Sequence, residues 1–285
     1  MFNSAAGRRP QRRRRQLDEL LAALRQQGWR VEITAKLELS AGCDVLVACG
    51  GDGTLHTLLQ PLAAAAARGQ PIPLLGVAPP WGTANIMAHA LGCPASARAA
   101  AQWLQRAWKQ GGRRLPLGTA DTSSGRRYFL ALAGVGYDAA LVAGMDEAVK
   151  LRWGKLAFGA HALTRWREYF PAPLALTYAG VTCSADGLLF SLTRFYAGRL
   201  RLGPLPPGER VLALALTGAP RLLPLQALAL LSVGLQRAPG VRRLAAEALS
   251  VATAGRPLQL DGEAAGVTPV RLGLEREGLR FLAPA

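Results

Sequence analysis

Hydrophobic positions along the first hundred residues alternate between helical spacing and short continuous runs. Leu17, Leu20, Leu21 and Leu24 recur at helical spacing and Gly28 ends the pattern, which predicts an amphipathic helix. Apolar or alternating runs that are typical of short strands then alternate with further helical segments. The strands are predicted at residues 29–34, 45–49 and 74–78, and the helices at residues 54–67, 85–91 and 95–110. This alternation predicts a parallel α/β sheet.

The pattern changes after Gly111 and Gly112, where strand-like runs separated by turn signals fill the remaining chain. These runs cover residues 128–133, 174–178, 188–192, 211–216, 258–260, 270–274 and 280–282. Many short strands of this kind are typical of an antiparallel sandwich. We therefore predict an α/β protein with two domains. Residues 1–114 are predicted to form a three-layer α/β domain with a parallel sheet. Residues 115–285 form an antiparallel β-sandwich domain whose last residues are able to pack back on the first domain.

The longest apolar stretch covers residues 211–236, where Arg221 is the only charged residue. Pro220 and Pro224 interrupt it, and neither remaining part reaches the roughly 18 to 20 apolar residues that a spanning helix needs. We predict a buried strand followed by a buried helix rather than a membrane span.

Composition changes this picture mainly through charge. Half of the residues are hydrophobic and 18% are charged, which indicates a folded chain. Lys and Arg number 34 against 18 Asp and Glu, so the net charge of +16 should attract polyanions. Basic residues gather at residues 8–15 and again, beside aromatic residues, in a predicted helical segment at residues 147–169. The basic residues are Arg8, Arg9, Arg12, Arg13, Arg14 and Arg15 in the first group, and Arg152, Lys155, Arg165 and Arg167 in the second.

We predict that both basic segments dock peripherally on an anionic membrane surface, although a solvated basic face would give the same pattern. No recognised nucleic-acid module is present, so we predict no nucleic-acid partner. The four cysteines are scattered without metal-ligand spacing, which favours reduced thiols, and no apolar signal segment follows the early arginines. We expect a cytoplasmic protein at the inner face of the membrane, with a homodimer left open.

A glycine-rich loop follows the predicted strand at residues 45–49 and opens a helix. It reads Gly50, Gly51, Asp52, Gly53 and Thr54. Glycines at such a strand-to-helix turn let backbone amides approach a phosphate, and the helix N-terminus favours the anion. Asp52 would repel a bare phosphate, so we expect it to face a magnesium shell or a ribose hydroxyl. A tight turn with local hydrogen bonds is the alternative.

A second loop, residues 79–85, follows the next predicted strand and again opens a helix. It contains Gly82, Thr83 and Asn85. Parallel neighbouring strands end at the same sheet edge, so the two loops should face each other across one crevice. Alone, this loop could equally be a turn with a threonine cap.

Two further motifs follow in the second half. One contains Gly134, Gly136 and Asp138, and the other reads Asp261, Gly262 and Glu263. By local sequence alone, these segments could be a strand end with a glycine bulge and an ordinary hairpin turn. All four motifs, taken in this order, resemble the diacylglycerol kinase catalytic-domain family of lipid kinases, which includes bacterial diacylglycerol kinases and the sphingosine and ceramide kinases. The resemblance spans essentially the whole chain.

The resemblance implies an ATP-binding α/β domain and a β-sandwich domain with the active site between them. It implies transfer of the γ-phosphate of ATP, with Mg²⁺ as counter-ion, to a lipid hydroxyl, and diacylglycerol giving phosphatidic acid is the leading reaction. Glu263 matches the proton acceptor, with Asp261 beside it, and Asp138 is placed near the lipid substrate. The implied nucleotide contacts are Gly50, Gly51, Asp52, Gly53, Thr54, Leu55, His56, Gly82, Thr83 and Asn85.

NAD kinases share a similar first loop, so an NAD kinase-like enzyme is one alternative. Departures from the family pattern leave a second, a non-catalytic lipid- or nucleotide-binding homologue. Residues 3–7 lack the usual proline, and His56 and Thr57 stand where an Asn-Glu pair is frequent. Ile86 replaces a common Asp. Glu209 stands one or two places away from an acidic residue that helps to hold a structural magnesium in many bacterial members, so we expect that site to be missing or rebuilt.

Overall fold

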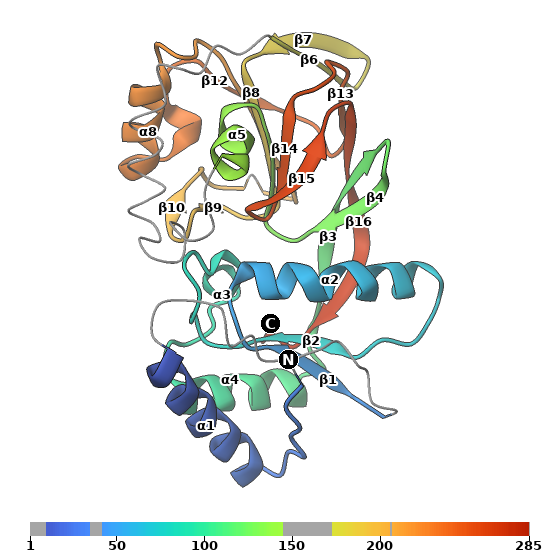
Figure 1. Ribbon diagram of the computed structural model, residues 1–285, viewed down its shortest axis with the longest axis vertical. Helices are drawn as coiled ribbons and strands as arrows, with labels where there is room; N and C mark the ends of the chain where they lie inside the picture. The colour runs from blue at the N-terminus through green and yellow to red at the C-terminus, as the bar shows by residue number, and fades with distance from the viewer. Residues whose placement is uncertain (1–9, 35–41, 145–172, 206, 285) are drawn as a thin grey trace. The chain divides into compact units, whose positions relative to one another are not determined.

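A computed structural model of the protein describes residues 10–34, 42–144, 173–205 and 207–284. The chain divides into two compact units (Figure 1). Unit 1 comprises Met1–Leu115 and Arg276–Ala285, and unit 2 comprises Pro116–Glu275. Several residues named above lie outside the described residues: residues 3–7, Arg8, Arg9, and the whole predicted helical segment at residues 147–169.

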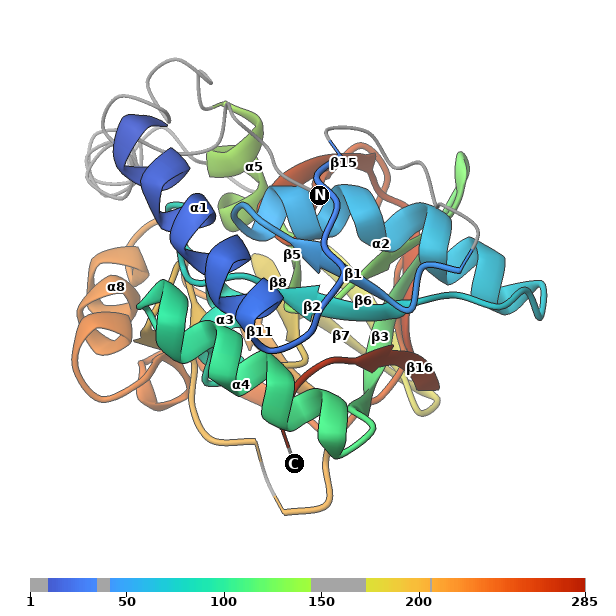
Figure 2. The same cartoon turned by 90° about the horizontal axis from the view of Figure 1, so that it is seen from below.

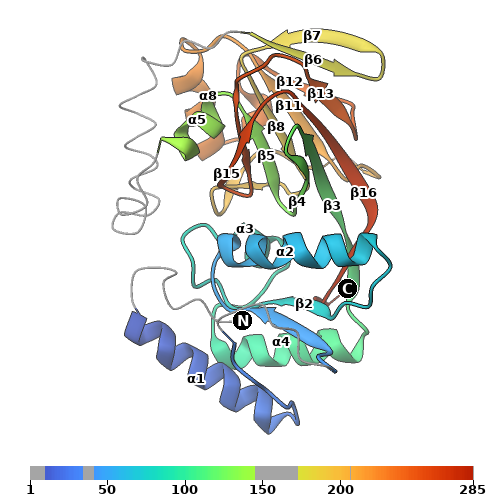
Figure 3. The same cartoon turned by 45° about the vertical axis from the view of Figure 1, so that its right-hand side comes forward.

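Unit 1 is a parallel α/β layer structure, as the alternating pattern predicts. Strands β1 and β2 pair in parallel with Val45 opposite Leu74, and the end of β16 adds to β2 in parallel at Phe281. Helix α2 covers one face of this sheet, and helices α1 and α4 lie side by side on the other face (Figures 2 and 3). The elements are α1 (Pro10–Gln26), β1 (Val45–Ala48), α2 (Asp52–Ala67), β2 (Leu74–Val77), α3 (Ile86–Ala90), α4 (Ala97–Lys109) and β16 (Val270–Phe281).

The leucines that predicted the first helix form its buried face, since Leu17, Leu20 and Leu24 are at most 3% exposed. The strand predicted at residues 29–34 is wrong, because the structure has no strand there. Trp29 instead packs on α4, with its ring centroid 5.8 Å from that of Trp108 and its indole N–H bonded to that helix. Aromatic packing has replaced sheet pairing in this segment.

Unit 2 is built from antiparallel strands. A six-stranded sheet has the order β12-β11-β8-β5-β14-β15. In a second group of strands the order is β16-β13-β6-β7. Strand β3 pairs with both β16 and β4. The strands are β3 (Arg113–Thr122), β4 (Gly125–Phe129), β5 (Leu132–Val135), β6 (Leu174–Tyr178), β7 (Val181–Ala185), β8 (Gly187–Ser191), β11 (Leu212–Leu216), β12 (Val241–Leu244), β13 (Leu249–Val251), β14 (Pro257–Leu260) and β15 (Glu263–Val267). The smaller elements are α5 (Tyr137–Ala143), β9 (Phe195–Tyr196), β10 (Leu200–Arg201), α8 (Leu223–Leu231) and the 3₁₀ turn η1 (Leu235–Arg237).

The core of unit 2 lies between its two groups of strands, which both contribute fully buried side chains. Phe129 of β4 and Phe190 of β8 meet edge to face with centroids 6.1 Å apart, and Leu176 and Leu272 join the same cluster. The predicted fold class, a parallel α/β layer followed by an antiparallel sandwich, is therefore confirmed. The runs at residues 270–274 and 280–282, predicted as separate strands, form one continuous strand, β16.

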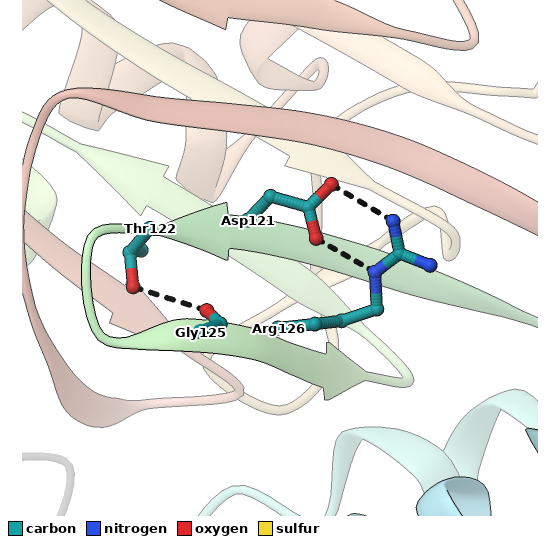
Figure 4. Close-up of polar contacts among 4 residues, drawn as sticks. All are labelled: Asp121, Thr122, Gly125 and Arg126. Atoms are coloured by element: carbon teal, nitrogen blue, oxygen red, sulfur yellow. Dashed lines mark hydrogen bonds and ion pairs between the residues drawn. The ribbon is translucent and has the colours of Figure 1, made fainter.

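The β3–β4 hairpin is closed by polar contacts at its exposed end (Figure 4). Arg126 donates two hydrogen bonds to the carboxylate of Asp121, at 2.6 and 3.0 Å, and Thr122 donates to the carbonyl of Gly125 at 3.2 Å. The hydrogen bond from Arg126 holds the pKa of Asp121 below its ordinary value. This pair is solvent-exposed, so it adds little to stability.

The apolar stretch at residues 211–236 forms the predicted strand and helix, but only the strand is buried. Residues 212–215 of β11 are fully buried, whereas α8 exposes Leu225, Leu228 and Leu231. The expected buried helix is therefore wrong, because Gln226 occupies the inward face of α8 and turns the leucines outward. Within the described residues, no helix combines the length and apolarity needed to cross a bilayer.

Candidate functional site

The first glycine loop forms the turn from β1 into α2. Gly51 precedes the first residue of α2 with extended backbone, and the helix begins at Asp52. A Cβ on Gly50 would lie 2.2 Å from the hydroxyl oxygen of Thr54, so this turn has no room for a side chain there. The loop thus places the open N-terminus of a sixteen-residue helix at the carboxyl end of β1.

The second loop is closed on itself by Asn85. Its side chain accepts a hydrogen bond from the amide of Gly82 at 2.7 Å and donates one to the carbonyl of the same residue at 2.7 Å. Asn85 takes the left-handed conformation, with φ 54°, which asparagine tolerates better than most residues. The result is a rigid turn between β2 and α3.

Asp52 joins the two loops. Its carboxylate accepts hydrogen bonds from the amides of Ile86 at 2.9 Å and Met87 at 3.2 Å, which lie in the first turn of α3. Each of its two oxygens thus accepts one backbone amide, and the expected contact of Asp52 with a magnesium shell or a ribose stays a prediction. The apolar Ile86 contributes through its backbone N–H.

Contact between the loops is as close as backbone atoms allow. A Cβ on Gly82 would lie 2.5 Å from the Cα of Gly51, and one on Gly51 would lie 3.1 Å from the Cα of Gly82. A cavity of about 10 Å³, the room of roughly one water, lies beside them and is lined by residues of β1, β2, α2 and α3. The glycines are thus required by packing between the loops as well as by any ligand.

The remaining residues predicted to contact the nucleotide divide into two groups. Thr54, Leu55 and His56 are at most 5% exposed, and His56 lies 3.3 Å from the side chain of Gln60 on the same helix. Thr83 is exposed in the second loop. The buried three shape the start of α2 from inside, whereas Thr83 is accessible to a ligand.

In unit 2, Asp261 holds the turn between β14 and β15. Its carboxylate accepts hydrogen bonds from three successive amides, Leu130 at 2.9 Å, Ala131 at 2.8 Å and Leu132 at 3.1 Å. Asp261 is only 8% exposed and has a left-handed φ of 54°. A buried carboxylate bound by three amides is held in one orientation, and the expected catalytic role of Asp261 stays a prediction. The same bonds explain why the single strand predicted at residues 128–133 is split into β4 and β5.

Asp138 takes part in a second hydrogen-bond network, in which Asp138 and Tyr196 are half-buried. Its carboxylate accepts hydrogen bonds from the hydroxyl of Tyr196 and from the side-chain amide of Gln259, the latter at 2.6 Å. Gln259 in turn accepts a hydrogen bond from the amide of Gly262 at 2.8 Å. Asp138 is therefore hydrogen-bonded within unit 2 and connects to the residue that precedes Glu263, and its expected place near the lipid substrate stays a prediction.

Gly134 makes room for this network. A Cβ at that position would lie 2.1 Å from a carboxylate oxygen of Asp138 and 2.8 Å from the amide nitrogen of Gln259. Burial raises the pKa of Asp138, while its two hydrogen bonds oppose that rise, and burial also raises the pKa of Tyr196.

Sequence reasoning missed Tyr196 and Gln259. Gln259 carries a usable signal, because it is a polar residue between two buried leucines in a strand directly before Asp261. Tyr196 carries none, since it lies far along the chain from its partner.

Glu263 opens β15 and is half-buried, two residues beyond Asp261. Among the described residues, no three His, Cys, Asp or Glu side chains gather in a group that could hold a metal ion. Glu209 forms an ion pair with Arg243. The expected loss or rebuilding of the structural magnesium site stays a prediction.

Both glycine loops, at the ends of the parallel strands β1 and β2, lie in a part of the chain that is similar to a known protein family. Residues 1–112 match the family model of the diacylglycerol kinase catalytic domain. The expected resemblance to this family is thereby confirmed. The match extends to just beyond the end of α4 and includes both loops, whereas the motifs around Asp138 and Glu263 lie outside it.

Curated relatives agree with the diacylglycerol kinase match. A protein named "Probable lipid kinase YegS-like" from Pseudomonas syringae pv. tomato (strain ATCC BAA-871 / DC3000) is 32% identical over 170 residues, which cover 56% of this chain and 52% of that protein. The chain spans between 38% and 57% of the length of the curated relatives that it matches.

Solved structures share the fold at low sequence identity. A crystal structure from Bacillus anthracis str. Sterne, whose name includes the words diacylglycerol kinase, has a TM-score of 0.65 and 17% identity, covering 94% of this chain and 82% of that one. An NAD kinase from Archaeoglobus fulgidus in complex with ATP has a TM-score of 0.53 and 15% identity, covering 93% and 88%. Identities this low establish the fold alone.

Proposed function

We propose that this protein is an ATP-dependent lipid kinase that transfers the γ-phosphate of ATP to a lipid hydroxyl, with diacylglycerol as substrate and phosphatidic acid as product. The observation that carries the proposal is the pair of glycine loops locked together at the ends of β1 and β2. They lie inside the region that matches the diacylglycerol kinase catalytic domain, and the curated relatives' names support a lipid substrate.

The first loop suits a nucleotide phosphate because the dipole of α2 gives positive potential at its N-terminus, and glycines let a phosphate approach the backbone. We assign phosphate contact to Gly50, Gly51 and Gly53, and a further contact to the exposed Thr83. Asp52 keeps the second loop in place through its bonds to α3. The substrate is ATP as its magnesium complex, and the metal arrives with the nucleotide.

Phosphoryl transfer to an alcohol also needs a group that accepts the hydroxyl proton. We assign this role to Glu263, a half-buried carboxylate. Asp261 positions Glu263 by fixing the turn against residues 130–132. The network of Asp138 and Gln259 holds the same turn from the other side through the amide of Gly262.

The test is incubation of the pure protein with labelled ATP and magnesium and a panel of lipid alcohols that includes diacylglycerol, sphingosine and ceramide. A parallel sample with NAD tests an NAD kinase-like activity. Label in a lipid product is the expected result. A folded protein that binds ATP but labels no lipid would refute the proposal and favour a non-catalytic binding protein.

Glu263→Gln tests the assignment of the proton acceptor. The substitution keeps size and polarity but removes basicity, so kcat should fall by about 10² to 10⁴ while ATP affinity and melting temperature stay unchanged. Glu277→Gln is the matched control, because that side chain is 86% exposed and 4.0 Å from its partner, Arg114. Turnover of Glu263→Gln near the wild-type rate would contradict this role.

A further inference from the structure

Helix α8 is apolar almost all round, with Gln226 as its only polar side chain. Its large side chains Leu225, Leu228 and Leu231 are 47%, 61% and 69% exposed, whereas Gln226 is 3% exposed. These leucines recur every third residue and therefore form one stripe along the helix. With Val233, 57% exposed just beyond the helix, we call them the α8 apolar surface. A helix of a globular protein ordinarily places such residues toward its core.

The orientation of α8 is fixed by hydrogen bonds from Gln226. Its side-chain amide donates to the carbonyl of Thr217 at 3.1 Å and to the carbonyl of Pro239 at 3.2 Å. Rotating the helix to bury the leucines would expose this amide and leave two carbonyls without that donor. The α8 apolar surface is thus a stable feature of unit 2, and it holds four of the eight large exposed hydrophobic residues in the described chain.

Exposed arginines lie on the segments next to this surface. Residues 187–243 contain eight arginines and a single acidic residue, Glu209, which is paired with Arg243. Asp186, directly before this range, accepts a hydrogen bond from the amide of Ala219. Arg221 is exposed directly before α8, and Arg201 and Arg237 are exposed on β10 and η1, the elements that pack against α8. The helix itself carries no charge. An uncharged apolar stripe with a basic rim is thus exposed on unit 2.

We propose that the α8 apolar surface docks on an anionic lipid bilayer, with the leucines inserted among acyl chains and the arginines on headgroup phosphates. This pattern suits interfacial helices, in which apolar burial and attraction to anionic lipid act together. The site differs from the two basic segments that the sequence suggested. The inference deepens the proposed function, since a lipid kinase on this surface would meet its substrate in the membrane.

A second copy of the chain fits this surface less well than a bilayer. In a symmetric dimer the same patch meets itself, so the rim arginines of both copies would face one another and repel. One short helix is also small beside the roughly 800 Å² that each partner buries in a stable protein interface. A negatively charged lipid surface satisfies both the apolar stripe and its rim.

The experiment is vesicle flotation without nucleotide, comparing pure phosphatidylcholine with vesicles that contain about one third phosphatidylglycerol. The wild type should bind the anionic vesicles preferentially. Leu228→Glu with Leu231→Glu should weaken that binding by at least about tenfold, because two apolar insertions are lost and two negative charges are added. Val181→Glu is the matched control, since Val181 is 52% exposed on β7 and its variant should bind like the wild type.

Arg221→Gln with Arg237→Gln should reduce the preference for anionic over neutral vesicles while leaving thermal unfolding unchanged. Equal vesicle binding by the wild type and the double glutamate variant would overturn the proposal. A second outcome would also overturn it: light scattering shows a wild-type dimer, and the double glutamate variant is a monomer that still binds vesicles. The surface would then be the contact with a second copy.

An activity assay with a short-chain diacylglycerol in detergent micelles distinguishes failure of the kinase proposal from failure of the docking proposal. The double glutamate variant should phosphorylate it at the wild-type rate and lose activity only toward anionic vesicles. Vesicle binding by a wild type that labels no lipid would refute the kinase and support the docking surface. Lipid phosphorylation by a wild type whose vesicle binding is unchanged in the double glutamate variant would support the kinase and refute the docking surface.

Discussion

Replacing Asp261 by asparagine tests whether this carboxylate holds the β14–β15 turn or takes part in the reaction. Asparagine keeps the shape of the side chain and adopts the left-handed φ of 54°. With its oxygen turned toward Ala131 and Leu132, the new NH₂ group replaces the oxygen that now accepts from Leu130 at 2.9 Å. One bond to a charged acceptor is lost, and two buried donors then face each other.

The expected cost is about 3 kcal/mol, since a hydrogen bond to a charged group contributes about 1.5 to 3 kcal/mol and an unpaired buried donor adds to the loss. For a domain the size of unit 2 this corresponds to a fall in Tm of roughly 6 to 12 °C. The assay is thermal unfolding followed by circular dichroism. Asp121→Asn is the control, because its exposed pair with Arg126 should contribute less than about 1 kcal/mol.

Lipid phosphorylation by Asp261→Asn is then measured well below its Tm. We expect a reduced kcat that the substitution causes indirectly, by loosening the turn that carries Glu263, and a residual activity above that of Glu263→Gln. An unchanged Tm combined with activity as low as that of Glu263→Gln would refute this reasoning, because Asp261 would then act on the reacting atoms.

Three further predictions concern the glycines and the buried acid. Gly82→Ala places a Cβ 2.5 Å from the Cα of Gly51, so the loops must separate; we expect a loss of about 2 to 4 kcal/mol in urea unfolding and weaker ATP binding in calorimetry. Gly134→Ala displaces the carboxylate of Asp138, 2.1 Å from the new Cβ, and should lower stability by about 1 to 3 kcal/mol in the same assay. Burial raises the pKa of Asp138, so its contribution to stability is complete below the unfolded pKa of about 3.9 and is lost as pH rises through the raised value. Asp138→Asn lacks this titration, and its stability should fall less than that of the wild type between about pH 4 and pH 7; parallel curves would contradict the raised pKa.

The sequence predicted the features that depend on local signals. Leu17 and its helical neighbours identified α1, and the glycines at positions 50, 51 and 82 identified turns at strand ends. Parallel pairing of β1 with β2 then followed from general sheet rules, which brought the two loops together.

The sequence could not predict which distant groups bond to the half-buried acids. Asp52 bonds to amides 34 and 35 residues away, and Asp138 bonds to Gln259, 121 residues away. Both acids were therefore expected to face ligands. The orientation of α8 was missed for a related reason, because average hydropathy ignores the one glutamine whose hydrogen bonds decide which face turns inward.

The end of β16 makes unit 1 a discontinuous domain. Phe281 is fully buried beside Leu75 of β2, and the amide of Leu282 donates to the carbonyl of Leu75 at 3.0 Å. During synthesis, β2 therefore keeps an open edge until residue 282 has left the ribosome, although both glycine loops emerge much earlier. An excised fragment that ends at residue 115 would carry the same unpaired edge permanently, and such an edge recruits strands from other chains.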